Sequence, residues 1–246
     1  MADRDRRVLV ALDAASWGRS VLEAGAELAS ALGARLEGLF VEDTDLVHLA
    51  GSPFARELSI VTGAWRDLAA EDVERALRLE AAKLERLLAE AAKRAQVPWS
   101  FTTARGRLIV VAAAREAELT VLAARPAAPT AAEGRLVRGS IAVVFDGSPA
   151  AVRALEVAGR LAGALGRELR VLVSERAAPL AAAEARAWLA SRSGVAVALP
   201  PGEAALAHAL QRARSKLLIQ AVPDAMPLEA LVGLLDRLSC PLLIVR

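Results

Sequence analysis

The chain has 246 residues, of which 55% are hydrophobic and 24% are charged, and its formal net charge is +2. This length is enough for one large domain or for two domains of about 120 residues each. Acidic and basic residues are interleaved without a run of Lys or Arg, and there is no tyrosine, so the composition argues against a nucleic-acid-binding surface. No apolar run approaches the ~20 residues of a membrane span.

The N-terminal segment and the cysteine content both favour a cytoplasmic protein. The opening residues "MADRDRRVLV" are charged and lack the apolar region of a signal peptide. The single cysteine, Cys240, excludes a disulfide within the chain and fits a reducing compartment.

The sequence contains an internal repeat with an offset of 133 residues. "VLVALDAASWGRSVLEAGAELASALG" from Val8 aligns without a gap with "IAVVFDGSPAAVRALEVAGRLAGALG" from Ile141. Asp13 falls on Asp146, and Gly33 falls on Gly166. A repeat of this length is a whole structural unit, so the chain is predicted to hold two related domains.

The first copy starts with a buried strand over 8–12, a helix that ends at Gly33 and a strand over 35–41, a pattern that predicts a right-handed βαβ unit. Residues 42–66 have no counterpart of equal length in the second copy. We expect them to form a surface excursion at the carboxyl end of the first sheet, with one short helix. Their apolar residues should need a partner, either the neighbouring lobe or another chain. A helix over about 67–96 follows, flanked by Trp65 and Trp99, which we interpret as its anchors.

The rest of the chain completes the two units. The first copy continues with strands over 99–104 and 119–124 and a helix over 108–116. A linker rich in proline and glycine covers 126–139, which divides the chain into domains 1–125 and 140–246. The second copy is predicted to have strands over 141–145, 169–174, 195–199, 216–221 and 241–245 and helices over 149–165, 180–192, 203–214 and 227–238. The first copy therefore lacks its fifth strand and the helix before it.

These stretches resemble the universal stress protein family. Both "RVLVALDAASWGRSVLEAGAELASALGARLEGLFVED" and "GSIAVVFDGSPAAVRALEVAGRLAGALGRELRVLVSE" are similar to the opening of such a domain, and "LLDRLSCPLLIVR" looks like its last helix and strand. The resemblance implies an α/β fold with two tandem, doubly wound, parallel-sheet domains of the Rossmann-like type. It also implies that such a tandem chain folds as an internal pseudo-dimer.

The resemblance also implies where a nucleotide would bind. ATP-binding members hold the ribose and adenine with an aspartate that ends the first strand and with backbone that ends the second strand. The matching positions here are Asp13, Val41 and Asp146, with Gly147 and Ser148 keeping the family form of the turn. The alternative is that each aspartate caps the helix that follows it, and this alternative is favoured here.

The family's phosphate motif is not intact in either copy. That motif reads Gly, two residues, Gly, nine residues and Gly-Ser or Gly-Thr, and its glycines let backbone N–H groups approach phosphate. In the second copy Pro223, Asp224, Met226 and Pro227 stand at the glycine positions; proline lacks the N–H donor and aspartate repels phosphate. In the first copy "GRLVRGS" has the wrong spacing. ATP is therefore possible but not favoured, and no cofactor is expected.

Other candidate residues do not assemble into a site. His48 and His208 lack the neighbouring ligands that a metal needs, so no metal is expected. Cys240 stands beside a core strand and is expected to be a buried, inert thiol. The resemblance and the lost motif together lead us to expect a tandem universal stress protein that is not an enzyme and has lost ATP binding. It would act as a stress-response or regulatory module by presenting a surface or binding an unidentified small ligand. Two alternatives stay open: a nucleotide sensor that holds ATP or AMP at Asp13, and a slow nucleotide hydrolase that would lack a visible base or metal set.

The last strand bears on assembly. In the family it often pairs with its equivalent in a partner, and an unpaired apolar strand invites pairing. We therefore expect a homodimer of the tandem chain across a twofold axis, formed by Pro241, Leu242, Leu243, Ile244 and Val245. The alternative is that this strand packs against the first lobe and that the chain stays monomeric.

Overall fold

The computed structural model describes residues 6–14, 18–52, 54–59, 62–115, 117–123, 139–174, 179–190, 192, 194–199, 203–222, 228–238 and 240–246. We call residues 6–123 the first half and residues 139–246 the second half. The predicted linker, 126–139, lies outside the described residues except for Gly139.

The first half contains six strands and four helices within its described residues. In chain order they are β1 (Arg7–Leu12), α1 (Gly18–Leu32), β2 (Arg35–Glu42), α2 (Thr44–Ala50), β3 (Arg56–Leu58), β4 (Trp65–Asp67), α3 (Ala70–Ala95), β5 (Trp99–Arg105), α4 (Leu108–Ala113) and β6 (Leu119–Leu122). The βαβ unit predicted for the opening residues is confirmed, and Gly33 follows α1 with a φ of +66°.

The second half contains five strands and four helices within its described residues. They are β7 (Ser140–Phe145), α5 (Pro149–Leu165), β8 (Leu169–Ser174), α6 (Pro179–Leu189), β9 (Gly194–Leu199), α7 (Glu203–Arg212), β10 (Ser215–Ala221), α8 (Leu228–Leu235) and β11 (Leu242–Val245). The order and type of these elements match the prediction from the repeat, and Gly166 ends α5 in the left-handed conformation, as Gly33 does after α1.

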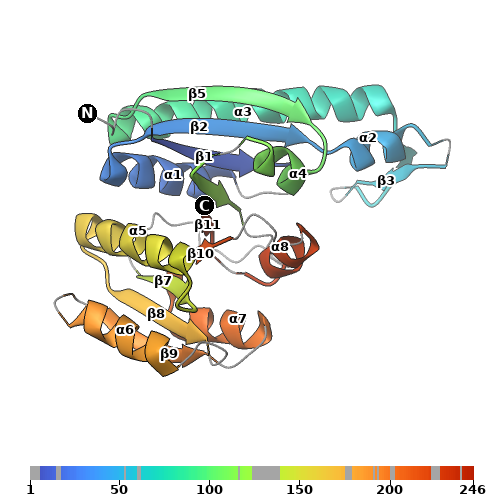
Figure 1. Cartoon of the computed structure of the whole chain (residues 1–246). Helices are drawn as coiled ribbons and strands as arrows, with labels where there is room; N and C mark the ends of the chain where they lie inside the picture. Colours follow the sequence, from blue (N-terminus) through green and yellow to red (C-terminus); the bar gives the residue numbers. More distant parts are fainter. Residues whose placement is uncertain are drawn as a thin grey trace.

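Both halves contribute to one nine-stranded sheet with the order β5-β2-β1-β6-β11-β10-β7-β8-β9. Strands of the same half are parallel, and the direction reverses where β6 meets β11. Figure 1 shows the first half in blue and green and the second half in yellow and red, with β6 and β11 between them. The parallel, doubly wound sheet predicted for each repeat is therefore confirmed, but the two half-sheets are continuous.

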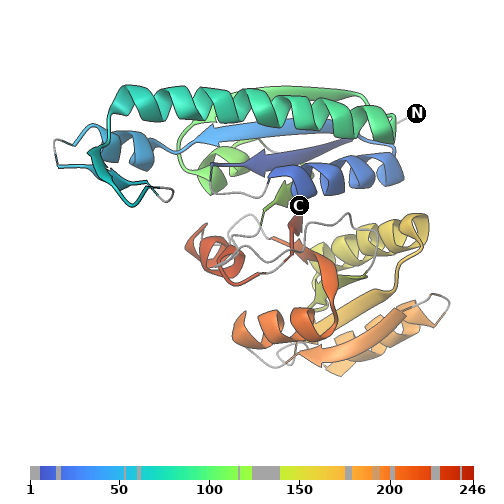
Figure 2. The same ribbon diagram turned by 180° about the vertical axis from the view of Figure 1, so that it is seen from behind.

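Helices cover both faces of the sheet. The larger hydrophobic cluster places residues of α1, α3, α5 and α6 against one face, and a second cluster places α4, α7 and α8 against the other. Figure 2 shows α1 and α3 lying over the strands of the first half. Because both faces are covered, the central strands are apolar throughout; Val8, Leu9, Val10, Ala11 and Leu12 of β1 are all fully buried.

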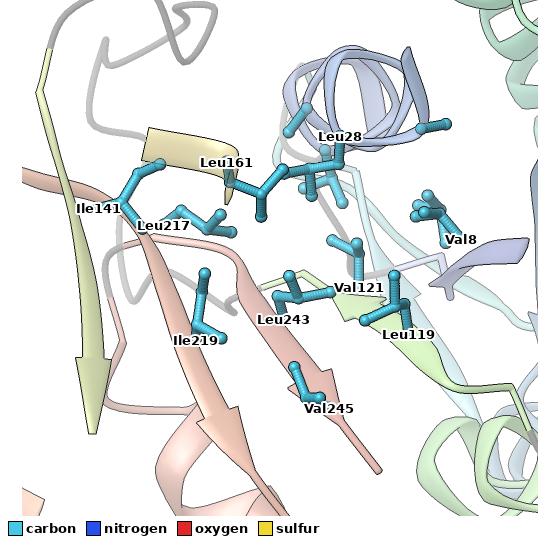
Figure 3. Packing of buried hydrophobic residues seen from close by; sticks show 14 of the residues in the cluster. Val8, Leu28, Leu119, Val121, Ile141, Leu161, Leu217, Ile219, Leu243 and Val245 are labelled. Atoms are coloured by element: carbon cyan, nitrogen blue, oxygen red, sulfur yellow. The ribbon is translucent and has the colours of Figure 1, made fainter. Parts of the chain in front are cut away.

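The contact between β6 and β11 is the seam between the halves. Leu119 stands opposite Val245, and Val121 stands opposite Leu243. These four side chains are buried in the larger cluster, and Leu28 of α1 and Leu161 of α5 lie over them (Figure 3). The core is therefore continuous from one half to the other.

This seam corrects the predicted homodimer through Pro241, Leu242, Leu243, Ile244 and Val245. One edge of β11 pairs with β10 and the other pairs with β6, so β11 has no open edge for a second chain. The physical reason is that the first half lacks the fifth strand that would pair with β6. The edge of β6 is therefore open to β11 of the same chain. Pairing there avoids the loss of translational and rotational freedom that association costs.

The excursion over 42–66 forms α2 and the two-stranded sheet β3–β4. The short helix was predicted, whereas the hairpin was not. Figures 1 and 2 show α2 and β3 beyond the end of β2. Leu46 and Val47 pack against the larger cluster, and α2 contacts α3, so these two residues find their apolar partner within the first half and not in the other lobe or another chain. In contrast, Phe54 is 89% exposed.

The two tryptophans that flank α3 do not anchor it. Trp65 is 59% exposed and Trp99 is 39% exposed. The helix is held instead by its apolar stripe, which includes the buried side chains of Leu77, Leu84 and Leu88.

Candidate functional site

The structure brings Asp13 and Val41 together at the carboxyl end of the first half-sheet. Leu12 of β1 pairs with Phe40 of β2, so the next residues along the two strands, Asp13 and Val41, are neighbours. Strand β1 lies between β2 and β6, and the connections from β1 and to β6 run over opposite faces of the sheet. This is the switch point where open α/β sheets bind ligands.

Burial limits what these two residues can offer to a ligand. The Asp13 side chain is 4% exposed, and Val41 is fully buried. In this conformation Val41 therefore offers no accessible group to a nucleotide, and Asp13 offers a small part of its surface.

In the second half, the predicted residues Asp146, Gly147 and Ser148 shape the turn that leads into α5. The Asp146 Oδ1 accepts a hydrogen bond of 2.9 Å from the backbone N–H of Ser148. The Ser148 Oγ accepts one of 3.1 Å from the N–H of Ala151, and Ser148 is the N-cap of α5. Gly147 has a φ of +82°, which favours glycine. Asp146 therefore fixes the turn, as the alternative held, but the residue that caps α5 is Ser148 and not the aspartate.

Helix α6 packs close to this turn. A Cβ atom added at Gly147 would lie 3.0 Å from the Cβ atom of Ala181. The glycine therefore serves both the backbone conformation of the turn and the close approach of α6.

The segments that carry the degenerate phosphate motif are not described. Residues 124–138 and 223–227 both lie outside the described residues, so the argument from Pro223 and Asp224 stays a prediction from sequence. The structure does describe the neighbours of β6, the strand that precedes the first of these segments. Strand β11, from the second half, occupies the place beside β6, and α8 packs against α4.

An ion-pair network that the sequence did not reveal links the carboxyl ends of β2 and β5. The Arg105 Nε lies 2.8 Å from Oε2 of Glu42, and a terminal nitrogen of Arg105 lies 3.4 Å from Oε1 of Glu74. The hydrogen bond to Glu42 and the attraction of both carboxylates raise the pKa of Arg105. The only sign of this network in the sequence was that Glu42 aligns with an identical residue, Glu175, in the second repeat. That identity does not indicate that Arg105 is the partner of Glu42.

Cys240, His48 and His208 lie apart from Asp13 and Asp146. Cys240 is a free cysteine, and its expected buried position is confirmed. Burial raises its pKa to about 12, which is consistent with an inert thiol. His48 and His208 are both exposed. Across the part of the chain that the structure describes, no group of three or more His, Cys, Asp or Glu residues could hold a metal ion.

Two cavities lie near the amino ends of the strands, away from Asp13 and Asp146. One, of about 110 Å³, is bounded by α1 and α3, and the Arg94–Glu23 ion pair of 2.9 Å belongs to its lining. The other, of about 560 Å³, is bounded by the end of α5, the start of β8 and Arg192. No described helix is long and apolar enough to cross a membrane.

Solved structures share this fold. A universal stress protein from Archaeoglobus fulgidus DSM 4304 is 13% identical with a TM-score of 0.62, and the alignment covers 99% of this chain and 97% of that one. A putative universal stress protein from Pseudomonas aeruginosa UCBPP-PA14 is 13% identical with a TM-score of 0.51 and coverages of 98% and 93%. A functionally unknown protein from Pseudomonas aeruginosa PAO1 is also 13% identical, with a TM-score of 0.50 and coverages of 98% and 92%.

No protein-family model matches the sequence, and no curated protein matches it. The structural comparisons show that the chain has the fold of the universal stress proteins over nearly its whole length. At this level of identity, they establish the fold alone.

Proposed function

We propose that this chain is a non-catalytic stress-response module of the universal stress protein type that has lost ATP binding. The observation that carries the proposal is the turn at Asp146, Gly147 and Ser148. Its polar side chains accept hydrogen bonds from the backbone at the start of α5, so they serve the turn and the helix cap.

The geometry of the first half supports the same proposal. Asp13 is buried at 4% exposure, so contact with a ribose would require the turn after β1 to open. Glu42, at the end of the neighbouring strand, forms an ion pair with Arg105. The polar groups near this strand end are therefore already engaged or buried.

The sequence supports the loss of phosphate binding. A phosphate cradle uses successive backbone N–H donors, and glycines allow their close approach. Pro223 and Pro227 remove two donors, and Asp224 adds a negative charge where phosphate would bind.

The absence of catalysis is part of the proposal. General acid–base chemistry requires a group with a suitable pKa within reach of a substrate, usually in a cleft. Arg105 and Cys240 have shifted pKa values; Arg105 belongs to an exposed ion-pair network, and Cys240 is fully buried. We further propose a cytoplasmic setting and a role in which the protein presents a surface or takes an unidentified small ligand.

Mass spectrometry of the purified protein tests the proposal. The protein is denatured, the supernatant is analysed for nucleotides, and the 260/280 nm absorbance ratio of the native protein is recorded. We expect no stoichiometric ATP, ADP or AMP. Stoichiometric nucleotide would overturn the proposal in favour of the nucleotide-sensor alternative. In that case, Asp13→Asn and Asp146→Asn would show which half holds the nucleotide.

A further inference from the structure

The nine-stranded sheet ends in two edge strands, β5 in the first half and β9 in the second half. The two strands are counterparts, since each pairs with the second strand of its own repeat. Figures 1 and 2 show β9 at the outer edge of the second half. An edge strand presents unpaired N–H and C=O groups, and soluble proteins usually protect such an edge from other chains.

Strand β5 has such protection. Its sequence, Trp99–Arg105, contains Ser100, Thr102 and Thr103 and ends in a charged residue. That residue, Arg105, is held across the end of the sheet by Glu42 and Glu74. Polar and charged side chains of this kind make a strand edge unfavourable for pairing with another strand.

Strand β9 lacks the polar and charged side chains that protect β5. Its sequence, "GVAVAL" over Gly194–Leu199, contains no charged residue, no polar side chain and no proline. All six residues pair with β8 in continuous register, so no bulge twists the strand away. Val195 is 47% exposed, which is unusual for a β-branched residue in the interior of a strand.

We propose that β9 is the dimerisation edge of this protein and that its partner is β9 of a second copy, paired antiparallel across a twofold axis perpendicular to the sheet. This symmetry keeps the α6 side of one copy next to the α6 side of the other. Only residues on the same face can then stand opposite each other. With the axis at Val197, Val195 stands opposite Leu199 of the second copy, and Ala196 stands opposite Ala198.

The properties of β9 favour a second copy over a different protein. Every cross-strand pair in this arrangement is apolar, and no like charges meet. The contact is isologous and therefore closes at two copies, whereas pairing of β9 with β5 would be heterologous and would generate a ring or an open chain of copies. The same fold already joins two parallel half-sheets by antiparallel pairing at β6 and β11.

Two matched substitutions test this proposal by light scattering. Val195→Glu puts a charge on β9 beside Arg170, which already forms an ion pair of 3.3 Å with Glu168 and whose buried Nε has no hydrogen-bond partner, so a cation stands next to the new carboxylate in the monomer. Ser100→Lys puts a charge at the equivalent position of β5, beside Glu37. We expect the wild-type chain and Ser100→Lys to have twice the 25.8 kDa chain mass. We expect Val195→Glu to raise the dimer dissociation constant by at least about tenfold.

Several results would overturn the proposal. The first is a wild-type chain that is monomeric at about 100 micromolar, a concentration above the dissociation constants of specific dimers. The second is a folded Val195→Glu variant that stays dimeric. The third is an equal rise of the dimer dissociation constant in Val195→Glu and Ser100→Lys. If Val195→Glu fails to fold by circular dichroism, Val197→Cys decides the question. Opposed residues of antiparallel strands lie within disulfide reach, and Cys240 is buried. Mild oxidation should therefore give a covalent dimer, and its absence would contradict the proposed axis.

Discussion

At the scale of single residues, burial decides which side chains of this chain can react or bind. Asp13 ends a strand at the ligand-binding edge of the fold, yet it is 4% exposed. Asp146 occupies the equivalent position and is exposed, but its carboxylate accepts a hydrogen bond from the turn that follows it. Residues that align perfectly in sequence thus have different environments.

Cys240 offers a test of burial at one residue. Burial raises its pKa from 9.0 to about 12, so the thiol stays protonated in the folded protein at pH 9. We expect its reaction with iodoacetamide at this pH to be slower by about a hundredfold or more in the native protein than in guanidinium chloride. Because the pKa is raised on folding, the associated stability should be complete below pH 9 and be lost as pH rises towards 12. Equal labelling rates in native and unfolded protein would contradict the buried position.

Two helical glycines provide a second test. A Cβ atom at Gly25 would collide with the side chain of Val10, whereas one at Gly163 meets nothing within 4 Å. We expect Gly25→Ala to lower the free energy of unfolding by about 1–3 kcal/mol through overpacking. Gly163→Ala should raise it by up to about 1 kcal/mol because alanine favours the helix. Chemical denaturation of both variants measures these changes, and a Gly25→Ala variant that is as stable as the wild type or more stable would refute the packing of α1 on β1.

At the scale of elements, local pattern was sufficient for most helices and strands. Alternating buried strands and helices with a 3.6-residue period predicted α5 at its observed bounds and α3 to within a few residues. The β3–β4 hairpin could not be predicted because each strand has only three residues and no apolar alternation. A local cap at the start of α5 was predictable because such a side chain acts within three residues of its own position, but the prediction assigned it to Asp146 and the structure assigns it to Ser148.

The seam between β6 and β11 could not be predicted from local pattern. The missing fifth strand was visible in the sequence, and so was the apolar edge strand at the C-terminus. Which open edge that strand would choose depends on tertiary geometry, because β6 and β11 are more than a hundred residues apart. The candidate site also divides into a local part and a tertiary part. Asp13 and Val41 were predictable because they end strands, whereas the ion pairs of Arg105 depend on tertiary geometry and were not predictable.

Leu243 tests the role of β11 as an element of both halves. It is fully buried and stands opposite Val121 of the first half and Ile219 of the second half. We expect Leu243→Ala to lower the free energy of unfolding by about 2–5 kcal/mol. The control is Leu79→Ala on α3, where the side chain is 66% exposed and the change should stay within about 0.5 kcal/mol. Urea denaturation measures both, and a neutral Leu243→Ala would show that β11 does not hold the halves together.

At the scale of the whole molecule, the chain closes its central seam within itself. The first half lacks a fifth strand, and β11 of the second half lies in the space beside β6. The seam therefore leaves β5 and β9 as the edges of the sheet. This arrangement keeps the fold of the universal stress proteins over nearly the whole chain.

The loss of ATP binding is the central claim, and a thermal unfolding scan with Mg-ATP tests it most directly. A ligand at 100 times its Kd stabilises the native state by about 2.7 kcal/mol. For a chain of this size, that corresponds to a rise in Tm of several degrees. We predict that about 5 mM Mg-ATP changes the Tm by less than about 1 °C relative to magnesium at equal ionic strength. A rise of several degrees that Asp13→Asn or Asp146→Asn abolishes would contradict the account.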